Sequence, residues 1–118
     1  MADPLTEADK LCKETLEALE KLQDSHIEYA MSLKKRLQSL LNQIVESKKK
    51  IMVRSPQGKE ISNEIMNHAS KLHEAVTNLP NHKIDAEIVK EVEKMLGRVE
   101  ESVKKLVIFW KSFEYVTT

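Results

Sequence analysis

The feature that most constrains the fold is the stretch from Asp3 to Val53, which contains no glycine and only one proline, at its start. Apolar residues recur in it every eleven positions. Eleven residues of α-helix make three turns plus about 20°, so these residues form one slowly drifting stripe on a nearly straight helix. The pattern predicts a helix over residues 4–53 that is roughly 75 Å long. The rows of the stripe are Leu11, Leu22, Leu33 and Ile44; Ala8, Leu19, Ala30 and Leu41; and Ala18, Tyr29, Leu40 and Ile51.

Both ends of the predicted helix carry suitable residues. Asp3 can cap the helix and Pro4 can take its first position, where a missing N–H costs nothing. The lysines of 48–50 suit the negative C-terminal end of the helix dipole. The pattern leaves open a break near His26 or within the lysines of 48–50.

Two shorter helices are predicted over residues 57–78 and 85–116. Ser55 and Pro56 form a start signal for the first of them, and Pro80 ends it. Gly97 lies inside the second, where glycine costs about 1 kcal/mol, and it predicts a close approach between two helices. The apolar positions follow helical spacing: Ile61, Ile65, Ala69, Leu72, Val76 and Leu79, then Ile88, Val92, Met95, Leu96, Val99, Val103, Leu106, Trp110 and Phe113.

These lengths predict an all-α fold in one domain, residues 1–118. The expected architecture is an elongated antiparallel three-helix bundle or coiled coil with one long N-terminal helix. Two shorter helices cannot cover the stripe of a helix of about 50 residues, and exposed leucines over several turns favour association. We therefore expect a dimer. Its interface is predicted to include Leu19, Leu22, Tyr29, Leu33, Leu37, Leu40 and Ile44.

The charge pattern agrees with an antiparallel pair of chains. Residues 1–30 carry a net charge of −5 and residues 31–59 carry +7, although the whole chain has a formal net charge of zero. An antiparallel pair would place the acidic half of one helix beside the basic half of the other. Such complementarity mainly sets orientation and association rate.

Composition favours a helical protein in a reducing compartment. Charged residues make 32% of the chain and aromatic residues only 4%, which is typical of helices with wide polar faces. Cys12 is the only cysteine, so no internal disulfide can form. The longest apolar run, residues 106–110, is far shorter than the roughly 20 residues that span a bilayer. We expect a cytoplasmic protein, soluble or peripheral to a membrane.

Residues that could perform chemistry are few. His68 and His73 are five apart and would point in different directions on a helix, whereas helical metal sites use a spacing of four; His26 and His82 lie elsewhere. Neither a phosphate-binding glycine loop nor an arrangement that would activate Cys12 is recognisable. No catalytic, metal or cofactor residues are predicted, and we expect no enzyme.

The expected function is that of a helical interaction module that self-associates and tethers as yet unidentified protein partners. The alternative is a membrane-active protein, similar to helical pore-forming proteins, that uses the apolar segment 103–116 and binds an anionic membrane surface. Nucleic-acid binding is disfavoured because no recognisable module or interleaved aromatics accompany the basic residues. Contact residues for a partner or membrane are predicted to be Leu106, Phe109, Trp110 and Phe113, and a basic patch is predicted at Lys34, Lys35, Arg36, Lys48, Lys49 and Lys50.

Overall fold

The computed structural model describes residues 3–21, 27–79 and 86–114, and among these it describes residues 27–30 by their backbone alone. The described residues form four α-helices joined in part by one 3-10 turn, and they contain no strand. The all-α prediction is confirmed. In chain order the elements are α1 (Pro4–Glu20), α2 (Ile27–Lys48), the 3-10 turn η2 (Ile51–Arg54), α3 (Pro56–Thr77) and α4 (Ala86–Glu114).

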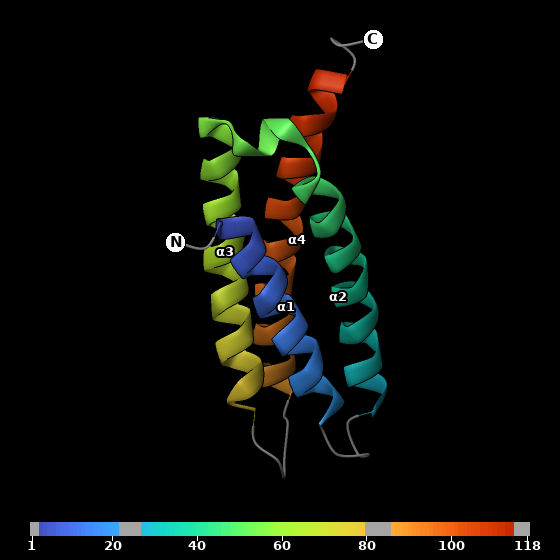
Figure 1. Cartoon of the computed structure of the whole chain (residues 1–118). Coiled ribbons are helices and arrows are strands. Elements are labelled where there is room, and N and C mark those ends of the chain that lie inside the picture. The colour runs from blue at the N-terminus through green and yellow to red at the C-terminus, as the bar shows by residue number, and fades with distance from the viewer. Residues whose placement is uncertain (1–2, 22–26, 80–85, 115–118) are drawn as a thin grey trace.

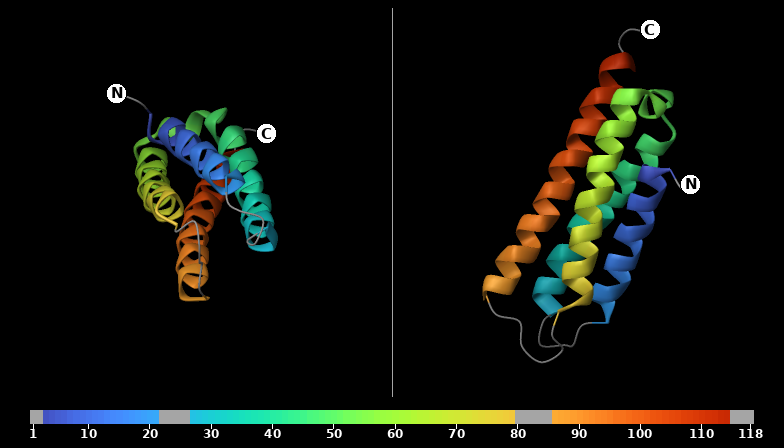
Figure 2. Two further views of the ribbon diagram at one scale, coloured as in Figure 1. Left: turned by 90° about the horizontal axis from the view of Figure 1, so that it is seen from below. Right: turned by 90° about the vertical axis from the view of Figure 1, so that its left-hand side faces the viewer.

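The four helices stand side by side in a bundle (Figure 1). α1 packs against α2 and α3, and α4 packs against the same two helices. Seen along its axis, the bundle therefore has α1 and α4 at opposite corners (Figure 2). α1 and α3 run in one direction, α2 and α4 in the other, and η2 crosses from α2 to α3 over one end of the bundle (Figure 1). We call this the η2 end.

The predicted helix over 4–53 is wrong. α1 ends at Glu20, Lys21 lies in a turn, and α2 begins at Ile27 and packs back against α1. A helix of roughly 75 Å would not fit a molecule whose longest extent is 52 Å. Between α1 and α2 the sequence has four consecutive polar residues, 23–26, which interrupt the apolar stripe. Asp and Ser among them have side chains that compete with helical backbone hydrogen bonds.

Folding the stripe back on itself lets the chain bury it without a partner. Its two halves meet each other and the apolar faces of α3 and α4, as a continuous core. The apolar faces predicted for α3 and α4 lie mainly in this core. Buried residues include Leu5, Ala8 and Leu19 of α1, Leu33, Leu37, Leu40 and Ile44 of α2, Ile65, Ala69, Leu72 and Val76 of α3, and Val92, Leu96, Val99, Val103, Leu106 and Trp110 of α4.

The start of α3 is built as the sequence indicates. Ser55 is the N-cap, its hydroxyl oxygen accepts a hydrogen bond from the Gly58 N–H at 3.1 Å, and Pro56 opens the helix. The same hydroxyl donates to the Met52 carbonyl at 2.6 Å, which ties the cap to η2. Gly58 packs so closely on this turn that a Cβ there would overlap the carbonyl oxygens of Met52 and Val53. The η2 turn is therefore held firmly against α3.

Gly97 has no such neighbour, so the predicted close approach at this position is wrong. A Cβ built at Gly97 meets nothing within 4 Å. The residue lies in the interior of α4, where a glycine loses more backbone entropy on folding than an alanine does. The close approach of backbone segments occurs at Gly58 instead.

The two glycines form a matched pair for a stability test. Gly97→Ala should raise the free energy of unfolding by about 1 kcal/mol, because alanine favours helix and the space is open. Gly58→Ala should lower it by about 1–3 kcal/mol, because the added methyl forces η2 away from α3. Urea unfolding followed by circular dichroism measures both. A neutral Gly58→Ala would contradict the packing of η2 described above.

Candidate functional site

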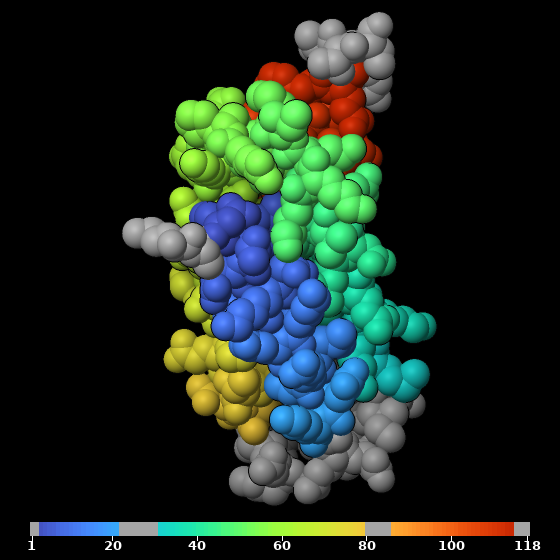
Figure 3. Space-filling model, in the orientation of Figure 1, coloured from blue at the N-terminus to red at the C-terminus, as the bar shows by residue number. Residues whose placement is uncertain are grey.

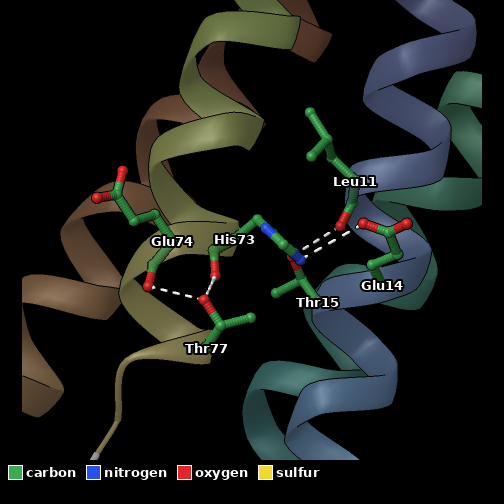
Figure 4. Close-up of polar contacts among 6 residues, drawn as sticks. All are labelled: Leu11, Glu14, Thr15, His73, Glu74 and Thr77. Carbon is green, nitrogen blue, oxygen red and sulfur yellow. Dashed lines mark hydrogen bonds and ion pairs between the residues drawn. The ribbon is translucent and has the colours of Figure 1, made fainter.

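A groove between α1 and α3 is lined by acidic, basic, hydroxyl and apolar side chains. It has a volume of about 390 Å³ and is lined by Glu14, Glu17, Ala18, Lys21, His73, Val76, Thr77 and Leu79. His73 reaches from α3 toward α1, and its Nε2 lies 3.5 Å from the Glu14 carboxylate (Figure 4). The pair links the two helices, as an ion pair when the imidazole is protonated.

The hydroxyls near this pair are directed at backbone groups. Thr77 donates to the carbonyls of His73 and Glu74 at 2.9 and 3.0 Å, and Thr15 donates to the carbonyl of Leu11 at 2.7 Å (Figure 4). A serine-type nucleophile would instead donate its proton to the imidazole that activates it. The groove therefore has the features of a helix–helix contact rather than those of a nucleophilic site.

Cys12 lies beside a buried carboxylate in the core. Asp9 of the preceding turn is nearly buried, and its Oδ2 pairs with Lys13 at 3.1 Å and with Lys48 of α2 at 3.6 Å. Burial, with the Asp9 charge adding to it, raises the pKa of the Cys12 thiol to about 12. Reactive cysteines have lowered pKa values. This thiol is thus held in its protonated form as a small apolar core residue.

Metal ligands do not cluster in the part of the chain that the structure describes: no three His, Cys, Asp or Glu side chains there converge. His68 and His73 both lie on α3, while His26 and His82 fall outside the described residues. Among the described helices, none is long and apolar enough to cross a bilayer.

The residues predicted to form a dimer interface lie inside the chain's own core. Leu19, Leu33, Leu37, Leu40 and Ile44 are buried by α1, α2 and their neighbours. As placed here, they are not a surface for a second copy, because the bundle would have to open to expose them. Leu22 lies outside the described residues, as does the side chain of Tyr29.

The predicted basic patch is divided. Lys34, Lys35 and Arg36 lie more than three turns before Lys48 along α2, roughly 18 Å away at 1.5 Å per residue. Arg36 bonds to Glu100 of α4 through Nε, at 3.1 Å, and through its terminal nitrogen. Lys48 pairs with Asp9, and Lys50 with Glu114 at 2.9 Å. Only Lys48, Lys49 and Lys50 belong to the η2 end.

The contact residues predicted on α4 also separate into two groups. Leu106 and Trp110 are core residues, and the indole N–H of Trp110 donates to the Ser47 hydroxyl of α2 at 2.9 Å. These two side chains help to close the end of the bundle, and Trp110 also lines the pocket described next, so their role as contacts stays a prediction. Phe109 and Phe113 are partly buried, and their rings meet edge to face at a centroid distance of 5.2 Å.

An apolar pocket, which we call the end pocket, lies at the η2 end. The last turn of α4 projects past the other helices there (Figures 1 and 2). Its volume is about 280 Å³. The Lys50 ammonium lies over the Trp110 ring at 4.5 Å and the Lys111 ammonium at 5.9 Å. The pocket is lined by Lys49, Lys50, Ile51, Met52, Trp110, Phe113 and Glu114.

Ile51 is the most exposed large apolar side chain of the described residues, at 85%. The eleven-residue pattern places it in one row with Leu40, which is buried, and so indicates burial for both. α2 ends at Lys48, however, and η2 turns the chain so that Ile51 faces solvent. The role of Ile51 in a pocket was missed for this reason. The lysines of 48–50 directly precede Ile51, and the sequence pattern had left open a helix break there. That possible break was the signal that could have indicated the exposure of Ile51.

The exposed isoleucine is held in place from both sides. Val53, two residues later, is buried in the core, and the Met52 carbonyl is bonded to Ser55. Lys50, immediately before Ile51, is fixed by Glu114 and by the Trp110 ring. The end pocket is therefore a preorganised surface, which reduces the entropy lost on binding.

Burial of the Cys12 thiol predicts a pH dependence of stability. The unfolded thiol loses its proton near its ordinary pKa of 9.0, while the folded one keeps it up to about 12. The unfolded state then binds fewer protons, so stability falls as pH rises above 9. Between about pH 7.5 and about pH 10.5, wild type should lose about 2 kcal/mol relative to Cys12→Ala, which lacks the thiol. Urea unfolding at both pH values measures this, and parallel pH profiles would contradict it.

Comparison with known proteins gives no indication of function, so any functional proposal depends on the residues of the chain itself. No family model, no curated protein and no solved structure matches the chain.

Proposed function

We propose that this chain is a binding module, without a reaction of its own, that docks on a partner through the end pocket. The observation that carries this proposal is Ile51, exposed at 85% beside a pocket with apolar walls. Fully burying an isoleucine side chain is worth about 1.5–3 kcal/mol. A partner that covers this residue would obtain that stabilisation from a side chain already in position.

The pocket chemistry favours a ligand with an apolar group and a negative charge. Met52, Trp110 and Phe113 supply apolar wall, while Lys49 and Lys50 stand at its edge. Lys50 forms an ion pair with Glu114, whereas Lys49 is exposed to solvent. A ligand of this kind would bury its apolar part against Ile51 and place its charge near Lys49.

Tethering of partners stays part of this proposal, but its location changes. The expected dimer was based on a stripe that no second helix would cover, and the chain covers most of that stripe with its own helices. The end pocket has no such cover among the described residues, so it is the surface on which we place docking.

Anilinonaphthalene sulfonate, an apolar and anionic dye, tests the proposal directly. Trp110 is the only tryptophan and lines the pocket, so excitation of it should transfer energy to bound dye. We expect saturable binding that Ile51→Ser weakens by about tenfold, because an apolar contact worth about 1.4 kcal/mol is lost.

Ile108→Ser is the matched control, because Ile108 is exposed at 60% on α4 and does not line the pocket. This variant should bind the dye as wild type does. Equal loss in both variants, or dye binding without energy transfer from Trp110, would rule out the end pocket as the docking surface.

A further inference from the structure

We infer that the partner of the end pocket is the surface of an anionic lipid bilayer, on which the intact bundle docks with its η2 end. The inference rests on the proposed function and names the occupant of the same site. It is carried by the shape of the apolar surface, by the charges around it, and by its position at one end of the long axis.

The shape favours a flat partner over a helix or an extended peptide. Helix-binding grooves present apolar residues along several turns, and strand partners need an open sheet edge. Here the apolar surface comes from one 3-10 turn and the last turns of one helix. This surface is large enough to contact only one or two apolar groups of a partner. A bilayer accepts such a small apolar end because Ile51 and Phe113 can enter the boundary between headgroups and acyl chains.

The position of the surface permits this contact. The bundle measures 52 Å along its longest axis and 28 by 20 Å across. The lining residues of the end pocket belong to η2, to the two lysines directly before it and to the last turns of α4. α4 projects furthest at this end (Figures 1 and 2). Figure 3 shows η2 and the start of α3 forming this end above the N-terminal part of α1. An upright bundle can therefore present the described part of this end to a flat surface.

The charges at this end complement an anionic surface. Basic residues outnumber acidic ones there, and four of the bases are exposed: Lys49, Arg54, Lys59 and Lys111. The corresponding acids are Glu46, Glu60 and Glu114, the last of which is paired with Lys50. Among the described residues, the ends of α1 and α3 and the start of α4 at the opposite end carry Glu17, Glu20, Glu74, Glu87 and Glu91 against Lys21 and Lys90. An anionic surface would attract the first end and repel the second, so charge also sets the orientation.

Neither the apolar contribution nor the electrostatic contribution is sufficient alone to hold the bundle on a bilayer. One isoleucine and part of one phenylalanine bury less apolar surface than a single acyl anchor, which itself binds only weakly. A few exposed bases near an anionic leaflet add attraction that salt screens. Binding should therefore require anionic lipid, low salt and Ile51 together. This requirement distinguishes docking from nonspecific adsorption.

The test is partition onto vesicles of equal parts phosphatidylcholine and phosphatidylserine, with pure phosphatidylcholine vesicles as the comparison. We expect binding to the mixed vesicles that is at least about tenfold stronger and is lost at high salt. Ile51→Ser should reduce partition roughly tenfold, and Lys49→Gln or Lys111→Gln roughly fivefold.

Two matched controls stand in the same chain. Ile108→Ser removes an exposed isoleucine outside the end pocket, and Lys90→Gln removes an exposed lysine at the opposite end. Both should partition as wild type does. Reaction of Cys12 with a maleimide reports on the bundle, because the thiol is 1% exposed and should stay unreactive on the vesicle if the helices remain packed.

The outcomes separate this inference from the proposed function. Dye binding at the end pocket without partition onto either vesicle would overturn the inference, retain the proposed function and indicate an acidic protein partner. Partition that Ile51→Ser and Ile108→Ser reduce equally would overturn docking through the pocket. Rapid labelling of Cys12 on the vesicle would overturn docking of the intact bundle and indicate that α1 separates.

Discussion

The apolar stripe of residues 3–53 must be covered along its length, because water-exposed leucines over many turns would drive association. A straight helix would need a second chain to provide that cover. The structure uses a break instead: α1 ends at Glu20, and α2 returns along it, so that the two halves of one stripe meet. Helices α3 and α4 then cover the remaining apolar faces. The lateral surfaces of the bundle can thus be largely polar.

The same closure determines where an apolar surface remains. α2 stops at Lys48, and η2 has to cross the end of the bundle to reach α3. Val53 turns into the core, Gly58 lets the turn pack closely, and Ile51 is left outside. The much longer helix α4 continues past this turn and supplies Trp110 and Phe113 as the other wall. The end pocket is therefore a consequence of unequal helix lengths and of one tight crossing.

Capping residues and helical spacing predicted much of this fold. The features that they missed depend on how helices distant in the sequence pack together. The Ser55–Pro56 start of α3 and the apolar faces of α3 and α4 follow from capping and from helical spacing, which act within a few residues. Periodicity cannot distinguish a long helix from a hairpin of two helices, because both keep the stripe on one face. For that reason the pattern alone placed Leu33 and Leu40 at an interface between chains, whereas the structure buries them in the chain's own core. Trp110 was predicted as a contact because the end of α4 is apolar on every side, yet its indole lies against Ser47.

The central claim is that one chain closes its own stripe, and the size and mass of the molecule in dilute solution test it most directly. Light scattering combined with small-angle X-ray scattering on one sample gives both. A closed bundle predicts a mass of 13.6 kDa and a radius of gyration close to the 15.2 Å of its Cα atoms. Twice that mass with a radius of gyration on the order of 22 Å, the value for a rod as long as an unbroken helix over 4–53, would contradict the account.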